Sequence, residues 1–390
     1  MTPTGNIMGN TVGLYIHIPF CEKKCRYCGF LSFDGGSRGE TEIYVDALLR
    51  ELALAAPRDG TVTDTVFIGG GTPSILRFDD IENSMRTVRA EYDLAADAEI
   101  TIESNPGSLT AEKLRAFRGA GINRLSIGVQ SFDDDVLSTL GRIHRSADAA
   151  EAFRMARISG FDNINLDLMF GIPGQTDAQW DETLSEVLEL APEHISFYSL
   201  QLEPGTPFYE EYKNEKLELT DNETERRMYH RAVSALKDAG YIHYEISNAS
   251  MPGRRCLHNL KYWNYDGYIG TGLGASSFFN GKRYRNTGDL ESYIRFFSSG
   301  ADSDPPRIPE NEDARGEYGI YCFTALRTSE GISLSKFRDT FGISLYEAFP
   351  SSLASLGGYI SKGYLDASGG TISLTEKGID ISNEIMAEFV

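Results

Sequence analysis

Six short apolar runs, each followed by an amphipathic helical stretch, fill the first half of this 390-residue chain. Each run is rich in β-branched or aromatic residues and ends in polar or glycine-rich positions, as strands that lead into turns do. Strands that alternate with helices of this length predict parallel βαβ units in an α/β fold. Six units are too few for a closed eight-stranded barrel, so we expect a partial (β/α)6 barrel. The predicted strands are Leu14–Ile18, Thr65–Ile68, Glu99–Glu103, Arg124–Val129, Asn163–Met169 and His194–Leu200.

Helices are predicted between these strands from periodicity and from their end signals. One spans Thr41–Ala55, a second spans Thr110–Ala120 and stops before a glycine, and a third spans Ala147–Ser159 and also ends at a glycine. Helix-like spacing in the first predicts an apolar face made of Ile43, Ala47, Leu48 and Leu54.

Polar residues stand where several of the predicted strands end. In parallel α/β folds, ligands bind at the carboxyl edge of the strands, where these ends meet. We therefore expect them to converge on one binding site. They are Gly69, Gly70, Gly71 and Thr72 after the second strand, Glu103 at the end of the third, Gln130 after the fourth and Asp167 in the fifth.

Three cysteines follow the first predicted strand with the spacing C-x3-C-x2-C: Cys21, Cys25 and Cys28. A structural zinc site takes four protein ligands, and no fourth cysteine is close. A [4Fe–4S] cluster on three thiolates keeps one iron open for an exogenous ligand. The triad thus predicts a cluster that binds a further molecule.

Buried thiols and a disulfide both fit the three cysteines less well than a cluster does. Three buried thiols are the simplest alternative, but the intervening charged residues, which include Lys24 and Arg26, indicate a loop that is wet on one side and favours thiolate. A disulfide would leave one cysteine over, and Cys256 and Cys322 lie far away in the sequence.

Composition predicts a cytoplasmic protein that does not bind nucleic acid. The formal net charge is −20, from 37 basic and 57 acidic residues, which disfavours a phosphate backbone as partner. The chain has no apolar run of transmembrane length, and its first ten residues do not resemble a signal peptide. Five cysteines, three of them in one motif, indicate a reducing compartment.

The pattern changes after the sixth strand, and we predict three domains. Residues 1–210 form the partial barrel, 211–304 an α+β extension, and 305–390 a C-terminal domain, with a linker at Asp302–Pro306. In the last domain we expect helices, then a hairpin at Tyr364–Leu374 and a final helix. This order is winged-helix-like. Its 7 basic and 12 acidic residues argue against DNA binding.

Six phrases in a fixed order resemble one branch of the radical S-adenosylmethionine (SAM) superfamily. That branch contains oxygen-independent coproporphyrinogen III oxidase (HemN) and the related haem chaperone HemW, and the resemblance runs from Gly13 to the C-terminus. Each phrase alone is weak, but the set and its order are specific. The phrases are YIHIPFC (15–21), GGGTP (69–73), ESNP (103–106), GVQSF (128–132), NLDL (165–168) and GIPG (171–174).

The resemblance implies a role for each matching residue. The three cysteines would hold the cluster, with SAM on its open iron, and the barrel would be a radical SAM barrel. Arg142 would pair with the SAM carboxylate, although an exposed salt bridge is a strong alternative for this residue. Tyr15, the glycine turn with Thr72, and Glu103, Gln130 and Asp167 would surround SAM.

Three features favour the haem-chaperone branch. Gly29-Phe30 follows the third cysteine where the oxidase carries a further cysteine, and only about a dozen residues precede Tyr15. His258, Tyr262 and Trp263 match the HNxxYW haem motif of the chaperones, in which the imidazole would ligate haem iron. A packed aromatic segment with a core histidine is the alternative for this stretch.

The function that the resemblance implies is a haem chaperone that passes haem to acceptor proteins, with peripheral contact to membrane-bound acceptors allowed and the oligomeric state open. The alternatives are oxidative decarboxylation of coproporphyrinogen III and a radical reaction on an unrelated substrate. Haem, SAM and one [4Fe–4S] cluster are the implied cofactors.

The cysteine assignment is tested by substitution. Anaerobic reconstitution is expected to load about four irons per chain. Replacing Cys21, Cys25 or Cys28 by Ala should abolish loading, because each thiolate ligates a different iron, and Cys322→Ala should leave it intact. Iron and sulfide analysis measures this, and a fully loaded Cys25→Ala protein would contradict it.

Overall fold

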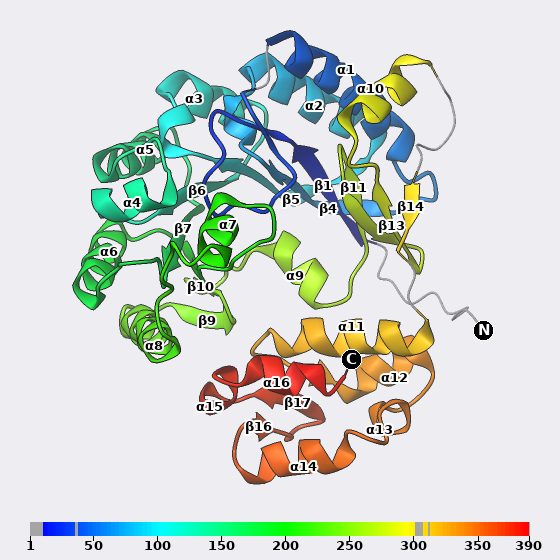
Figure 1. Ribbon diagram of the computed structural model, residues 1–390. Coiled ribbons are helices and arrows are strands. Elements are labelled where there is room, and N and C mark those ends of the chain that lie inside the picture. Colours follow the sequence, from blue (N-terminus) through cyan, green and yellow to red (C-terminus); the bar gives the residue numbers. More distant parts are fainter. Residues whose placement is uncertain (1–10, 36–37, 301–306, 311–312, 390) are drawn as a thin grey trace.

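The computed structural model describes residues 11–35, 38–300, 307–310 and 313–389 (Figure 1). The first ten residues and the predicted linker at 302–306 lie outside the described residues. Six parallel strands of the described chain lie side by side in the order β1-β4-β5-β6-β7-β8, which confirms the partial (β/α)6 barrel. They are β1 (Thr11–Ile18), β4 (Val62–Gly70), β5 (Asp93–Ser104), β6 (Arg124–Gln130), β7 (Ile164–Phe170) and β8 (His194–Ser199).

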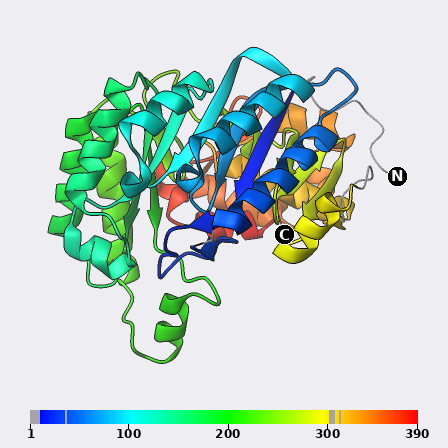
Figure 2. The same ribbon diagram turned by 90° about the horizontal axis from the view of Figure 1, so that it is seen from above.

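Helices cover the outer face of these strands (Figures 1 and 2). The predicted helices are present, with ends shifted by up to three residues. The outer helices are α1 (Arg38–Ala55), α2 (Phe78–Glu91), α3 (Ala111–Gly119), α4 (Asp134–Leu140), α5 (Ser146–Ile158), α6 (Asp177–Leu190) and α8 (Asn222–Asp238).

The predicted apolar face of α1 is partly wrong. Ala47 and Leu48 are buried, but Ile43 and Leu54 are 51% and 40% exposed. The buried stripe instead runs through Tyr44, Leu48 and Leu52, which are spaced by four residues and so share one face. The Tyr44 hydroxyl donates to the carbonyl of His17 at 2.7 Å, so this face is partly polar and escapes a search for apolar periodicity.

The α+β extension continues the same sheet instead of forming a separate one. β11 pairs in parallel with β1, and β10 pairs antiparallel with β8, so a twelve-stranded sheet forms among the described residues. The extension contains α7 (Pro207–Lys213), which projects away from the sheet in Figure 2. Its other elements are β9 (Ile242–Glu245), β10 (Asn248–Ser250), α9 (Leu257–Trp263), β11 (Tyr268–Thr271), β12 (Ser276–Phe279), β13 (Lys282–Asn286), α10 (Leu290–Ser298) and β14 (Arg307–Pro309).

The C-terminal region packs around its own apolar core, and α9 lies between it and the barrel strands (Figure 1). The predicted hairpin is present as an antiparallel pair of strands. No helix in the described ranges is both long and apolar enough to cross a membrane. The elements are α11 (Ala314–Leu326), β15 (Ile332–Ser333), α12 (Leu334–Phe341), α13 (Leu345–Ala348), α14 (Leu353–Ser361), β16 (Leu365–Asp366), β17 (Thr371–Leu374), α15 (Glu376–Ile379) and α16 (Ser382–Ala387).

The stability of the C-terminal core is expected to depend on Phe337. Its fully buried ring packs against Tyr321 and Phe341 at centroid distances of 5.4 and 4.9 Å. Phe337→Ala should destabilise the domain by about 3–5 kcal/mol, because the cavity it leaves cannot fully close. Phe323→Ala on the neighbouring helix, where the ring is 39% exposed, should change stability by no more than about 0.5 kcal/mol. Denaturant unfolding of both variants measures the difference, and equal losses would contradict it.

Candidate metal centre and cofactor site

The three cysteines line one cavity at the carboxyl edge of the barrel strands. This cavity measures about 140 Å³ and brings together most of the side chains predicted from the strand ends. All three cysteines are free thiols. Tyr15, Gly69 and His258 are the predicted residues that do not line it. The lining includes Cys21, Cys25, Cys28, Gly70, Gly71, Thr72, Glu103, Gln130, Arg142 and Asp167.

Burial and nearby hydrogen-bond donors act in opposite directions on the pKa of the thiols. Burial raises the pKa of Cys21 and of Cys28 above the ordinary value, and the ammonium of Lys24 only partly opposes this. The Thr72 hydroxyl lies 3.5 Å from the Cys21 sulfur, and a guanidinium nitrogen of Arg142 lies 3.3 Å from that of Cys25. These donors suit thiolates, which metal binding generates by releasing the protons.

Three free thiols on one cavity suit a cluster held by three cysteines. In a [4Fe–4S] cluster each thiolate ligates a different iron, so the ligands stand apart. The donor set therefore fits a [4Fe–4S] cluster held by three cysteines.

The glycine turn after β4 is joined by backbone hydrogen bonds to the chain that enters the cysteine loop. The amides of Gly71 and Thr72 donate to the carbonyls of Ile18 and Phe20, each at 2.8 Å. A Cβ at Gly71 would lie 2.6 Å from the Phe20 oxygen. Gly70 has a φ of +113°, a backbone conformation that favours glycine. Only glycine allows this close approach.

Two partly buried acids, Glu103 and Asp167, face the same cavity. The pKa of Glu103 rises to about 8, first because of burial and then because of the nearby Asp167 carboxylate. Burial also raises the pKa of Asp167, which accepts from the amide of Asn165 at 2.8 Å. The amide of Gly70 donates to Glu103 at 3.0 Å, so this side chain connects β5 to the glycine turn. Both acids lie where a bound cation or hydroxyl group would repay their burial.

Gln130 stands in a strained backbone conformation beside these acids. Its φ is +67°, which is uncommon for any residue but glycine, and it sits at an irregularity in the pairing of β6 with β7. Strain of this kind clusters at binding sites, where surrounding structure holds it.

Among the described residues, Arg142 has none of the exposed salt-bridge partners considered as its alternative. Its guanidinium bonds the side-chain oxygen of Asn105 at 2.5 Å and the carbonyl of Gly128 at 2.6 Å. Asn105, which belongs to the quoted phrase ESNP after the third strand, was given no role of its own in the sequence analysis. Tyr27 was also missed: it lines the cavity between Cys25 and Cys28, and no motif marks it.

Tyr15 is connected to the cysteine loop by hydrogen bonds through His17. Its hydroxyl lies 3.0 Å from Nδ1 of His17, whose Nε2 lies 2.9 Å from the carbonyl of Leu31. Since a carbonyl only accepts, Nε2 of His17 donates to it and Nδ1 accepts from Tyr15. The chain of bonds holds the end of the loop against β1.

His258, on α9, packs against β4 and does not line the cavity of the cysteines. Its side chain stacks on Phe67 and is 1% exposed, and burial lowers its pKa to about 3. Nδ1 lies 2.9 Å from the hydroxyl of Thr65, and Nε2 lies 2.9 Å from that of Tyr262. The imidazole is therefore neutral, and both ring nitrogens are engaged.

Comparison with known proteins identifies relatives of the whole chain. Residues 15–187 match the Radical SAM superfamily, and residues 322–381 match the HemN C-terminal domain. Heme chaperone HemW of Bacillus subtilis (strain 168) is 37% identical over 96% of this chain and 98% of its own length. Heme chaperone HemW of Escherichia coli (strain K12) is 35% identical over 97% of this chain and 98% of its own.

A solved structure shares the fold. Coproporphyrinogen III oxidase (HemN) from Escherichia coli superposes with a TM-score of 0.82 at 24% identity, over 97% of this chain and 90% of that chain. The partial barrel with a three-cysteine loop at its edge defines a radical SAM protein. Within that superfamily, the full-length similarity shows that the chain belongs to the family of the heme chaperone HemW.

The contact between the glycine turn and the cysteine loop is tested at Gly71. Gly71→Ala should move the backbone before Cys21, since a Cβ there overlaps the Phe20 carbonyl. We expect a loss of stability of about 1–3 kcal/mol and a lower iron content after reconstitution. Gly107→Ala is the matched control, because a Cβ there meets no described atom within 4 Å. Iron analysis and thermal unfolding measure both variants, and equal iron content would contradict the expectation.

Proposed function

We propose that this protein is a haem chaperone that binds haem and transfers it to acceptor proteins. The observation that carries the proposal is the full-length similarity to proteins named heme chaperone HemW. Phe30 supports the choice over the oxidase, because a phenylalanine stands where the oxidase has a further cysteine, and its ring is 70% exposed. The likeness to HemN at 24% identity supports the shared fold alone.

The cluster and SAM belong to this proposal through the cavity side chains. Cys21, Cys25 and Cys28 would hold the [4Fe–4S] cluster, which when bound supplies an electron and an open iron for SAM. Arg142 would turn from Asn105 to the SAM carboxylate, for which its planar fork is suited. Glu103, with a pKa of about 8, can donate or accept a hydrogen bond near neutral pH.

Gln130, Asp167 and Thr72 would complete the SAM contacts from the neighbouring strand ends, together with the backbone of the glycine turn at Gly69–Gly71. These groups lie at one edge of the barrel because parallel strands end together there. Tyr15 would contribute by holding the cysteine loop through His17, two residues further along β1.

His258 carries the haem part of the proposal through the motif on α9. The resemblance assigns its imidazole to the haem iron. In the described conformation Thr65 and Tyr262 occupy its two nitrogens, so ligation requires one of these hydroxyls to move away. The amides of Leu257 and His258 donate to the buried carboxylate of Glu99, and these bonds hold the start of α9.

Acceptor proteins would meet the chain in the cytoplasm or as membrane-bound partners reached from its surface. The acidic C-terminal domain would serve as a lid or docking surface. It would not read DNA, because its helices carry few lysine and arginine residues for phosphate contacts.

Haem titration and an activity assay test the proposed function. The reconstituted protein should bind one haem per chain, and His258→Ala should weaken binding, since it removes a hydrogen-bonded member of the motif. No protoporphyrinogen should form from coproporphyrinogen III with SAM and a reductant under anaerobic conditions. Multiple turnovers in that assay would contradict the chaperone function, and so would the absence of haem binding in a fully loaded protein.

A further inference from the structure

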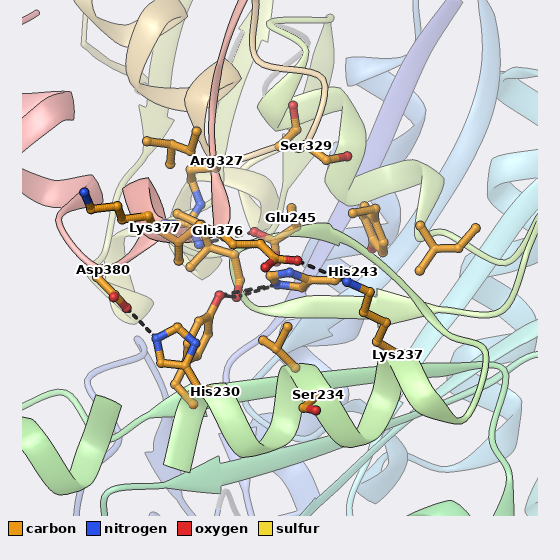
Figure 3. A pocket seen from close by; sticks show the side chains of 18 of the residues that line it. His230, Ser234, Lys237, His243, Glu245, Arg327, Ser329, Glu376, Lys377 and Asp380 are labelled. Atoms are coloured by element: carbon orange, nitrogen blue, oxygen red, sulfur yellow. Dashed lines mark hydrogen bonds and ion pairs between the residues drawn. The ribbon is translucent and has the colours of Figure 1, made fainter. Parts of the chain in front are cut away.

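A second, larger cavity lies between the barrel extension and the C-terminal domain. It measures about 770 Å³, which is within the range of small-molecule and cofactor sites. One wall comes from α8 and β9, and the other from the segments 326–329 and 374–380 (Figure 3). None of the SAM-site residues lines it.

Each wall of the cavity contributes aliphatic side chains. Val233, Ile242 and Ile246 stand on the barrel side, and Ile242 is 43% exposed. Leu326, Leu374 and Ile379 stand on the side of the C-terminal domain. Apolar walls that come from two domains suit a flat apolar ligand, because each face of the ring can be covered.

His243 is the metal-ligand candidate in this cavity (Figure 3). Its Nε2 lies 3.2 Å from the carbonyl of Ile246 and must donate to it, because a carbonyl only accepts. No described residue bonds Nδ1, so that nitrogen carries a free lone pair. Metal-binding imidazoles are held by this kind of bond from the second nitrogen.

Cations at the rim suit the carboxylates of a ligand. Lys237 pairs with Glu376 at 3.1 Å, and both side chains are mostly exposed, so water screens the pair and it contributes little to stability. A carboxylate on the ligand can therefore replace Glu376 at little cost. Arg226 lines the same cavity and pairs with Asp380 at 2.5 Å.

We propose that this inter-domain cavity holds haem, with Nδ1 of His243 as an axial ligand and Lys237 as a partner of a propionate. The inference rests on the proposed haem binding and names its site. The motif on α9 contacts this cavity through Trp263. The ring of Trp263 lies 4.7 Å from the guanidinium of Arg327, and Arg327 lines the cavity. His258 then acts as a positioning residue, through α9, and the iron ligand is His243.

The site has a built-in route for release. Main-chain hydrogen bonds join the two walls, from Ile246 to Arg327 at 3.0 Å and from Ser329 to Tyr244 at 2.9 Å. Elsewhere the cavity is bridged by side-chain ion pairs such as that of Lys237 with Glu376, which break more easily than backbone pairing. Opening at the ion pairs, with the backbone pairing as hinge, would expose the haem to an acceptor.

Titration of the full-length, cluster-loaded protein with haemin tests this site. His243→Ala should weaken binding at least tenfold and shift the Soret band. Ser234→Trp, on the exposed side of α8 in the cavity wall, should weaken binding by filling the space while the imidazole remains. Arg227→Ala is the control, because Arg227 lies on the same helix but does not line the cavity and pairs with Asp177 at 3.0 Å; this variant should bind within twofold of the unaltered protein.

The spectrum of His258→Ala separates the two histidines. Its Soret position should equal that of the unaltered protein even where affinity falls. A Soret shift in His258→Ala, together with normal binding by His243→Ala and Ser234→Trp, would overturn this site and leave haem binding in place. An unaltered protein that binds no haem would overturn the proposed function as well.

Discussion

The parallel pairing of β1 with β4 is the constraint on which the candidate metal centre depends. The register brings Ile18 opposite Gly70, where each strand ends. From that point the backbone of the glycine turn bonds the carbonyls that precede Cys21, so the cysteine loop and the turn share one wall. A side chain at Gly71 would separate them. The distance between the two loops is thus set by main-chain hydrogen bonds, which do not adapt to a bulkier residue as side chains do.

Side chains of the same strands form a row of packed rings that leads from the cysteine loop to α9. Tyr15 lies between His17, which bonds the cysteine loop, and His258, with ring centroids 5.9 and 6.4 Å apart. Phe67 stacks on both Tyr15 and His258. The support of the cysteine loop and the motif on α9 are therefore joined through one packed interior. This packing explains why His258 is buried so deeply and why its nitrogens bond to hydroxyls.

Sequence reasoning reached the strands and the strand-end residues because both follow from local signals. A β-branched run that ends in glycine is visible in the chain, and parallel strands must end at a common edge. It placed the face of α1 less well, since Tyr44 is buried to bond the carbonyl of His17, a contact with β1 that no periodicity shows. The role of Asn105 could not be predicted for a similar reason: its partner Arg142 comes from a different strand–helix connection.

The sequence by itself determined the type of fold, the cysteine loop and the residues that gather at its edge, because strand period, cysteine spacing and strand-end composition are written in short segments. Only the tertiary structure decided the surroundings of the two histidines. His258 meets Thr65 from β4, and His243 faces Leu374 and Ile379 from a domain more than a hundred residues further along. Whether an imidazole nitrogen is engaged or free depends on these distant partners. They meet only when the chain packs, so no local pattern specifies them.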